Sequence, residues 1–569
     1  YKLRFNGTTS ILGQTTLFFT VTEDSPLTLE GPITDGGANR SLIKDGIGRL
    51  VIGNSANSFG GVTAIKNGVL QLAAGANLGS GATYINGGIL TPYNAATLSG
   101  VTANGLVLVG QLGTSRYALP GIGISPTYGN IDSANQVNVN VPTAGMVLAI
   151  DGGETNLPVT SDIDLAQVGS GSNRVWISNA LSLDRTFQGL ITPAADGNIR
   201  LTSGGNTLVI SGLADRLGGA GSAAGLIFGF DHSTPINFAT ANVIQGNGGT
   251  ISVRVDNDTT GNVTVHRGVT ANVNGNGLIR PFGMGVVTQL GGVVSTDNAS
   301  TARLGNTDFR LFGGSTLLLD NSNVTGAPNI DRRLQSNTDI DLSSSTLRLI
   351  GDGGAATSSS QAVNSIDYRG GSTLSIDTDG ATAGRLTTLT TGTLNRIGQG
   401  TIQIRNIANT ASILGTPTGT QKLIVTTNPT VTNGMIGANI VLWGGANMAD
   451  PAQPLFVNYD PVDGAQAAVF TATATPAALA AATTSQIANI ESTALAVSGS
   501  PSVQALRIRS TASSHAVTTG TITIGSAAGV GQGAGLFLAH TSNDQVVHTS
   551  NFAFGAQEGM IYVSTPQGS

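Results

Sequence analysis

Short strands separated by glycine and asparagine turns constrain the fold of this chain more than any other feature. Three runs with alternating apolar and polar residues, Arg49–Ile52, Val62–Ile65 and Val69–Leu72, are each followed within three residues by a glycine. Alternation directs every second side chain to one face, and Gly and Asn supply the positive φ angles of tight turns. A strand of about four residues cannot bury a face alone, so each strand must stack on copies of itself.

Similar strands recur downstream, first at Gly205–Ile210 and then four more times. The last four contain Thr316, Thr346, Thr373 and Thr401, which are 30, 27 and 28 residues apart. A period between about 20 and 50 residues is typical of a solenoid or a propeller, and these intervals fit one β-helix turn better than a four-stranded blade. We therefore predict an all-β fold, a right-handed parallel β-helix (β-solenoid), on the order of 100 Å long at about 4.8 Å per turn.

Composition supports this fold and argues against several classes of function. Gly occupies 80 of 569 positions, whereas charged residues make up only 10%; an ordinary globular enzyme carries about 25% charged residues. The chain has no cysteine, which excludes disulfides and thiol chemistry. A net charge of −6 without a Lys/Arg run argues against a nucleic-acid partner. The sequence contains no uninterrupted stretch of 18 apolar residues, so we predict no membrane-spanning segment. The chain begins at Tyr1, so we expect a processed or partial chain.

The sequence suggests four consecutive segments without a clear linker between them. They are an N-terminal β segment (1–41), a repeat (42–105), degenerate rungs with lateral loops (106–474) and C-terminal rungs (475–569). The stretch Leu106–Asn138 breaks the pattern and suggests either a lateral loop or a decorated rung. The stretch Thr475–Glu491 is either a helix capped by Thr475 or a further β rung.

One stretch carries a recognisable motif. It reads Lys44-Asp45-Gly46-Ile47-Gly48-Arg49-Leu50-Val51-Ile52, then Gly60-Gly61-Val62-Thr63-Ala64-Ile65, then Asn67-Gly68-Val69-Leu70-Gln71-Leu72. This spacing resembles the autotransporter-associated β-strand repeat. Looser similarity to giant bacterial surface proteins with that repeat occurs in Asp339–Gly380, Asn433–Asp460, Ser502–Ile508 and Glu558–Val563.

The resemblance implies a secreted parallel β-helix on the outer surface of a Gram-negative cell, or released from it. In autotransporters a C-terminal β-barrel follows the passenger, whereas Ser564–Ser569 show no such barrel. Proteins with this repeat serve adhesion, biofilm matrix and surface coats, and the repeat itself carries no chemistry. Cell-surface or matrix polysaccharide is therefore an expected partner.

Parallel β-helices also include polysaccharide lyases and hydrolases, whose sites need carboxylates on neighbouring rungs. Four Asp-x-Asp pairs occur: Asp162/Asp164, Asp256/Asp258, Asp339/Asp341 and Asp377/Asp379. They fit solvated turns and strand edges better than a catalytic pair, and only Asp256-Asn257-Asp258 resembles a Ca²⁺ loop, without the terminal Glu. The histidines, His232, His266, His515, His540 and His548, lack zinc-ligand spacing. We predict no catalytic residue, no metal ligand, no cofactor and no enzymatic activity.

The two ends of the chain suggest a site of another kind. An open β-helix exposes end strands whose backbone groups can take up further strands. Large apolar residues gather near both ends: Tyr1, Leu3, Phe5, Leu17, Phe18 and Phe19, and then Phe552, Phe554, Met560, Ile561 and Tyr562. We predict that these residues join copies head to tail into an extracellular fibre or coat, since a heterologous contact that does not close gives filaments.

Three alternatives remain open at this point. The end strands could be the first and last rungs of a longer solenoid. The chain could be a monomeric autotransporter-type adhesin that binds host or glycan surfaces. A polysaccharide lyase or hydrolase would need Asp pairs aligned across adjacent rungs in a groove.

Overall fold

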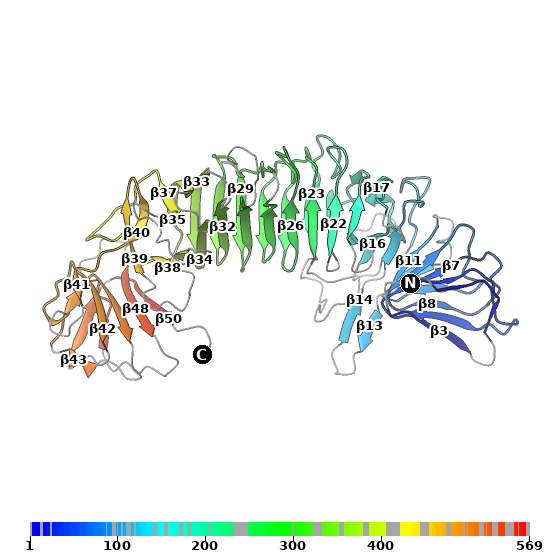
Figure 1. Cartoon of the computed structure of the whole chain (residues 1–569), viewed down its shortest axis with the longest axis horizontal. Helices are drawn as coiled ribbons and strands as arrows, with labels where there is room; N and C mark the ends of the chain where they lie inside the picture. The colour runs from blue at the N-terminus through cyan, green and yellow to red at the C-terminus, as the bar shows by residue number, and fades with distance from the viewer. Residues whose placement is uncertain are drawn as a thin grey trace. The chain divides into compact units, whose positions relative to one another are not determined.

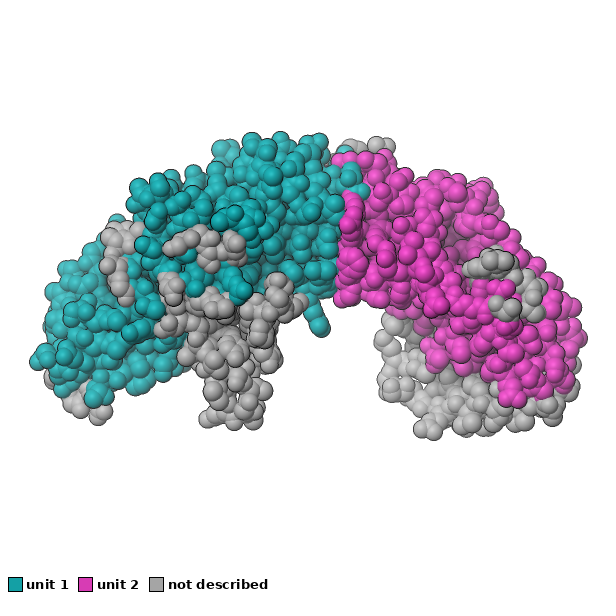
Figure 2. Space-filling view, turned by 180° about the vertical axis from the view of Figure 1, so that it is seen from behind, with its two compact units in different colours: residues 1–296, 302–307 teal, residues 297–301, 308–569 magenta. Residues whose placement is uncertain are grey.

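The computed structural model describes most of the chain. The described residues are 3–11, 15–22, 26–86, 88–93, 98, 101–103, 106–109, 115–118, 121–139, 141, 145–152, 157–169, 174–179, 184–203, 206–230, 249–298, 301–322, 333–351, 358–378, 386–405, 421–443, 455–473, 479–492, 496–497, 499–510, 517–518, 520–525, 533–540, 551–555 and 557–564. The fold is all-β and is dominated by parallel sheets, as the sequence predicts (Figure 1). The chain forms two compact units: residues 1–296 with 302–307, and residues 297–301 with 308–569 (Figure 2).

In unit 1 the chain returns again and again to one long parallel sheet. Its strands are β1 (Leu3–Phe5), β4 (Leu27–Leu29), β7 (Arg49–Ile52), β9 (Val69–Leu72), β11 (Ile89–Thr91), β15 (Gly121–Ile124), β16 (Met146–Ile150), β18 (Val175–Asn179), β21 (Asn198–Leu201), β23 (Gly225–Phe228), β25 (Val263–His266) and β27 (Val287–Leu290). Each pass of the chain through its sheets is called a rung below.

Other parallel sheets of unit 1 hold the remaining strands of each rung. The early rungs use β2 (Thr9–Ser10) with β5 (Ile33–Thr34), and β3 (Thr16–Thr20), β6 (Ser41–Asp45), β8 (Thr63–Ile65), β10 (Thr83–Ile85) and β12 (Val101–Ala103). Later rungs use β17 (Ile163–Asp164) with β20 (Ile191–Thr192), and β19 (Arg185–Phe187), β22 (Thr207–Ile210), β24 (Thr250–Val253), β26 (Thr270–Val273) and β28 (Val293–Thr296). The stretch predicted as a lateral loop or a decorated rung holds an antiparallel hairpin of β13 (Leu106–Val109) and β14 (Ser115–Ala118).

A column of apolar side chains runs through the long sheet of unit 1. The register places its members directly opposite one another, rung after rung: Leu27, Leu50, Leu70, Leu90, Ile122, Leu148, Ile177, Leu201, Phe228 and Val265. From Leu50 to Val265 every side chain in the column is fully buried. Each short strand therefore covers the apolar face of its neighbours, and the core grows rung by rung.

Buried polar groups hold the turns between strands. The amide of Asn57 accepts a hydrogen bond from Ile33 N at 2.8 Å and donates to Asn77 O at 2.7 Å, so one side chain links three successive rungs. Asn257 repeats this arrangement later, accepting from Leu217 N and donating to Pro281 O. A buried turn without such partners would leave backbone groups unsatisfied at a cost of about 1–3 kcal/mol each.

The first strands of unit 2 alternate between two parallel sheets. One contains β29 (Asp308–Phe312), β31 (Asp339–Ser343), β33 (Ser359–Arg369), β35 (Thr387–Arg396) and β37 (Gln421–Val425). The other contains β30 (Thr316–Asp320), β32 (Thr346–Gly351), β34 (Gly371–Thr378), β36 (Thr401–Arg405) and β38 (Ile440–Trp443). This first stack ends where β38 pairs antiparallel with β39 (Leu455–Asp460), which pairs antiparallel with β40 (Gly464–Ala467).

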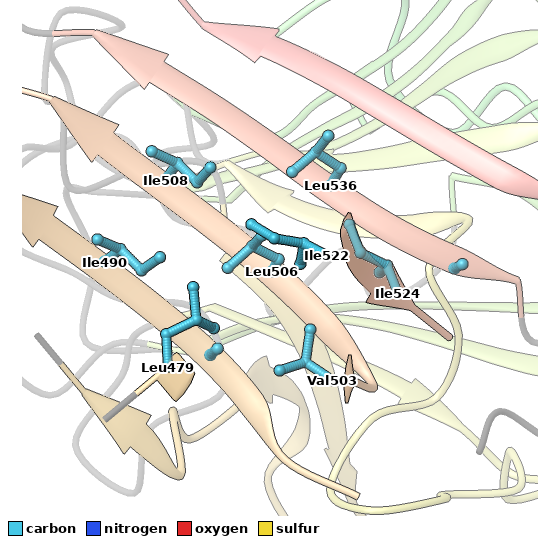
Figure 3. Packing of buried hydrophobic residues seen from close by; sticks show 10 residues of the cluster. Leu479, Ile490, Val503, Leu506, Ile508, Ile522, Ile524 and Leu536 are labelled. Atoms are coloured by element: carbon cyan, nitrogen blue, oxygen red, sulfur yellow. The ribbon is translucent and has the colours of Figure 1, made fainter. Parts of the chain in front are cut away.

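A second parallel stack follows in unit 2. Its main sheet contains β41 (Ala472–Thr473), β42 (Ile487–Ser492), β45 (Ala505–Ser510), β48 (Ala534–His540) and β50 (Gly559–Ser564). Smaller sheets pair β43 (Ala496–Val497) with β46 (Val517–Thr518), and join β44 (Ser502–Val503), β47 (Thr521–Ile524) and β49 (Asn551–Ala553). Leu506, Ile508, Ile522 and Leu536 meet in the core of this stack (Figure 3).

The sequence repeat is confirmed for two of its three intervals. Thr316 lies opposite Thr346, and Thr346 lies opposite Thr373. Thr373, however, pairs with Gln403 and not with Thr401. A shift of two residues keeps the same face buried because side chains alternate with a period of two, so the sequence pattern alone could not reveal it.

The stretch Thr475–Glu491, predicted as either a helix or a β rung, contains a short helical segment followed by a strand. Residues 479–480 are helical, and 474–478 lie outside the described residues. From Ile487 onwards the chain is strand β42, so a helix reaching Glu491 is wrong. Ile487, Ala488 and Ile490 are buried there on both faces of the strand, and this tertiary burial outweighs the helix propensity of the preceding alanines.

Within the described residues, no helix has the length and apolar character needed to cross a membrane.

Gly68 tests the close stacking of the turns. Its φ is +63°, and a Cβ there would lie 2.4 Å from both Gly46 O and Gly48 O. Gly75 has a similar φ of +74° but open space around it. Each Gly→Ala change should cost about 1–2 kcal/mol for the left-handed backbone, and Gly68→Ala should cost more because the stacked turn has to move apart. Hydrogen-exchange protection of Val69 and its neighbours measures the difference; equal loss in both variants would contradict close stacking.

Candidate functional site

The strand β1 lies at the edge of the long sheet of unit 1. Leu3 lies opposite Leu27 and Phe5 opposite Leu29, so both extend columns that are buried deeper in the sheet. Their own side chains are 58% and 49% exposed. Arg4, between them, forms an ion pair with Glu30 at 2.8 Å. The apolar columns of unit 1 thus end in two uncovered side chains two residues apart.

The second predicted strand of this end, β3, divides its side chains between two faces. Leu17 and Phe19 are half-buried and lie opposite Leu42 and Lys44, which are fully buried. Phe18 points to the other face and is 58% exposed, with Lys66 Nζ 5.9 Å from its ring centre. Tyr1 lies outside the described residues.

Most of the large side chains predicted for the C-terminal cluster pack inside unit 2. Met560 is buried with Phe456 and Phe537, and Tyr562 packs on the same cluster and donates a hydrogen bond to Ala438 O at 2.8 Å. This contact joins β50 to the residues around the antiparallel strands β38 and β39. Phe552 and Phe554 pack against the core of the second stack.

Ile561 and Val563 alternate with Met560 and Tyr562 along β50, so their side chains lie on the other face of the strand. Ile561 continues the column Ala488, Leu506, Leu536, and Val563 continues the column Ile490, Ile508, Leu538. The earlier members are buried or half-buried, whereas Ile561 is 57% and Val563 is 65% exposed. Val563 is not among the end residues predicted above, although its alternation with Ile561 along a strand is visible in the sequence.

The Asp-x-Asp pairs are mostly turn and strand-edge groups. Asp162 Oδ1 accepts from Leu190 N at 2.7 Å, and Asp256 Oδ1 accepts from Ile279 N and Arg280 N. Asp258 pairs with Arg280 at 3.6 Å. Each of these aspartates holds the turn of a neighbouring rung, which is a structural role.

Asp339 and Asp341 meet one condition for a catalytic pair, since they align with carboxylates on adjacent rungs. Asp339 lies opposite Asp308, and Asp341 lies opposite Asp367. Arg369 Nη2 binds Asp341 at 2.6 Å, and Arg310 Nη2 binds Asp308 at 2.8 Å. These ion pairs are of the kind that commonly forms on the exposed surface of a sheet.

The described residues contain no group of three or more His, Asp or Glu side chains that could hold a metal ion. His266 is buried, whereas His232, His515 and His548 lie outside the described residues. Asp377 is fully buried and pairs with Arg348 Nε at 2.8 Å, and its predicted partner Asp379 lies outside the described residues.

Lys44, the first residue of the repeat motif, is fully buried. Its ammonium donates to Asp45 O and Gly46 O at 2.8 Å and to Asn67 O at 3.1 Å. Burial lowers the pKa of Lys44 to about 8, and the nearby Asp45 carboxylate opposes this shift. The lysine of the motif therefore closes the corner between strands and fastens it to the next rung.

Arg49, also in the motif, belongs to a buried ionic cluster. Its guanidinium binds Asp151 through two hydrogen bonds, at 2.8 and 2.7 Å, and donates to Gln71 at 2.7 Å. Thr91 donates to Asp151 at 2.7 Å, and Arg185 lies 3.9 Å from it. Burial alone would raise the pKa of Asp151, but Arg49, Thr91 and Arg185 outweigh it and hold that pKa below its ordinary value. The cluster ties the first rungs of unit 1 to rungs about 100 residues later.

No protein-family model, curated protein or solved structure matches this chain.

Arg49→Met tests the buried cluster. The change leaves the Asp151 carboxylate buried without its main partner, and we expect a loss of about 3–5 kcal/mol in the stability of unit 1. Arg4→Met is the matched control, because the exposed Arg4–Glu30 pair should contribute about 1 kcal/mol or less. Urea unfolding of both variants measures the difference, and equal losses would contradict a stabilising role for the cluster.

Lys44→Met tests the corner lysine through pH. The folded-state pKa near 8 lies below the ordinary value of 10.5. Between these values the unfolded chain binds the proton that the folded chain has released, so stability should rise as pH rises through this window. The Lys44→Met variant should lack that rise, whereas Lys66→Met should keep it. Urea midpoints at pH 7 and pH 10 measure the effect; identical pH profiles for wild type and Lys44→Met would exclude it.

Proposed function

We propose that this protein is a non-enzymatic structural protein of the outer cell surface that joins end to end into an extracellular fibre or surface coat. In this proposal the stacked rungs form a right-handed parallel β-helix. The main support is that apolar columns, which are covered deeper in each stack, end uncovered at Leu3 and Phe5 on β1 and at Ile561 and Val563 on β50.

The energetics of these edges favour further stacking. Covering a Leu, Ile, Val or Phe side chain stabilises a structure by about 1.5–3 kcal/mol. The edge strands also present backbone N–H and C=O groups that a further strand can pair. Two edges with this character on one chain suit a head-to-tail polymer, because such a contact is heterologous and can continue indefinitely.

The interior of the repeat supports a structural role. Lys44, Arg49 and Asn57 all serve turns or buried pairs within the fold. Because these polar side chains bind groups within the fold, they support a role as a scaffold. We therefore also propose that the protein has no catalytic site. The resemblance of residues 44–72 to the autotransporter-associated β repeat supports a Gram-negative surface location, where polysaccharide would be a neighbouring partner.

Lysines on β50 test this function. Ile561→Lys with Val563→Lys places two charges on the uncovered columns, which should prevent stacking by leaving them unpaired and desolvated. The control is Val462→Lys with Val469→Lys, which changes two residues of unit 2 that are 75% and 72% exposed and lie off β50. We expect filaments of wild type and control in negative-stain electron microscopy across a concentration series, and single rods for the β50 variant.

Sedimentation velocity provides the quantitative measure of the same samples. Wild-type chains that stay single at every concentration would contradict the fibre and favour the monomeric adhesin, for which a glycan-binding screen is the next measurement. Filaments formed equally by all variants would exclude β50 as the joining edge.

A further inference from the structure

The first rungs of the chain have a specific order of strands. β1, β2 and β3 lie in three different sheets, and β4, β5 and β6 return to the same three sheets in the same order. The first two rungs therefore each contribute one strand to each of three parallel sheets, whereas the strands from β7 to β12 alternate between two of these sheets.

The last rungs of unit 2 repeat this order independently. β42, β43 and β44 lie in three sheets, and β45, β46 and β47 return to them in turn. β48 and β50 continue the first of these sheets, and β49 continues the third. Between the two ends, the strands from β21 to β28 alternate between only two sheets. The first and last rungs thus share a three-sheet arrangement that the rungs from β21 to β28 lack.

The uncovered side chains match as well. Leu3 and Phe5 are two residues apart on β1, and Ile561 and Val563 are two residues apart on β50. In the stacks of both units, parallel neighbours place an apolar pair of this spacing directly on another, as Leu50 and Ile52 lie on Leu70 and Leu72. A parallel contact between β50 and β1 would repeat this arrangement.

Resting on the proposed function, we infer that the partner of the β50 edge is the first rung of a second copy of this chain. β50 of one copy lies parallel to β1 of the next, with Ile561 opposite Leu3 and Val563 opposite Phe5.

The polarity of the edges selects this pairing over a symmetric one. β1 is the edge at which its stack begins, and β50 is the edge at which its stack ends. Only a begin-to-end contact continues the parallel ladder. Two β1 edges related by a two-fold axis would meet antiparallel and would place Leu3 opposite Phe5.

Cysteine cross-linking tests the register, because the chain has no cysteine of its own. Two single-cysteine variants with different affinity tags, Leu3→Cys and Ile561→Cys, are mixed and oxidised, so that a mixed disulfide reports only a contact between copies. Paired residues on parallel strands lie about 4.8 Å apart, within the Cα separation that a disulfide requires. We expect about tenfold more mixed dimer than for Leu3→Cys with Val462→Cys, a pairing outside the proposed contact.

A second set of mixtures fixes the register. Phe5→Cys should cross-link with Val563→Cys, and much less with Ile561→Cys, since a shift of two residues adds about 6.6 Å along the strand. All positions are exposed, so folding is preserved, and circular dichroism checks it.

The outcomes separate this inference from the proposed function. Filaments without these cross-links, or with a disulfide between Leu3→Cys and Phe5→Cys as the main product when those two variants are mixed, would overturn the β50–β1 pairing and leave self-assembly standing. Chains that neither assemble nor cross-link would overturn both. Filaments with both in-register mixed disulfides and without the shifted one would support the inference.

Discussion

Every strand of this protein depends on the neighbouring rung to cover its buried face. A strand of three to five residues gains too little from its own side chains to remain ordered in water. When Leu50, Leu70 and Leu90 lie opposite one another in register, each removes the apolar surface of the next from water, and the gain is repeated at each rung. The rest of the architecture serves to keep successive rungs in contact along this column.

The turns meet the second requirement of such a stack, because successive corners have to lie against one another. Gly46 and Gly68 lie at such corners, and a Cβ on either residue would lie only 2.4 Å from a backbone carbonyl oxygen of a neighbouring corner. Polar side chains then satisfy the backbone groups that the corners bury, as the Lys44 ammonium and the Asn57 amide do. Lys44, Gly46 and Gly68 thus permit and fasten the stacking of successive rungs.

The antiparallel strands β39 and β40 show how a stack can be closed. They end the ladder of β38 and place Phe456 against Phe537 of the second stack, with ring centres 4.4 Å apart. Phe456 and Val457 of this cover are fully buried. β1 and β50 lack such a cover among the described residues, and this contrast within one chain gives the end strands their functional interest.

The sequence by itself determined the class of fold and the position of most strands. Alternation over Arg49–Ile52 and Val69–Leu72 and the spacing of Thr316, Thr346 and Thr373 are local properties, and the structure places strands with matching register there. Local patterns also placed the apolar residues of β1 and β50 at candidate edges. They could not show that Met560 and Tyr562 pack inward while Ile561 and Val563 remain exposed, because this depends on Phe456 and Phe537 from distant strands.

Only the tertiary structure decided the contacts between residues far apart in sequence. The pairing of Arg49 with Asp151, the register shift at Gln403 and the strand at Ile487–Ser492 each depend on a partner many residues away. Sequence alternation fixes which face of a strand is apolar, but a shift of two residues leaves that face unchanged. The order of strands along the chain therefore follows from local chemistry, whereas the exact neighbour of each side chain follows from packing.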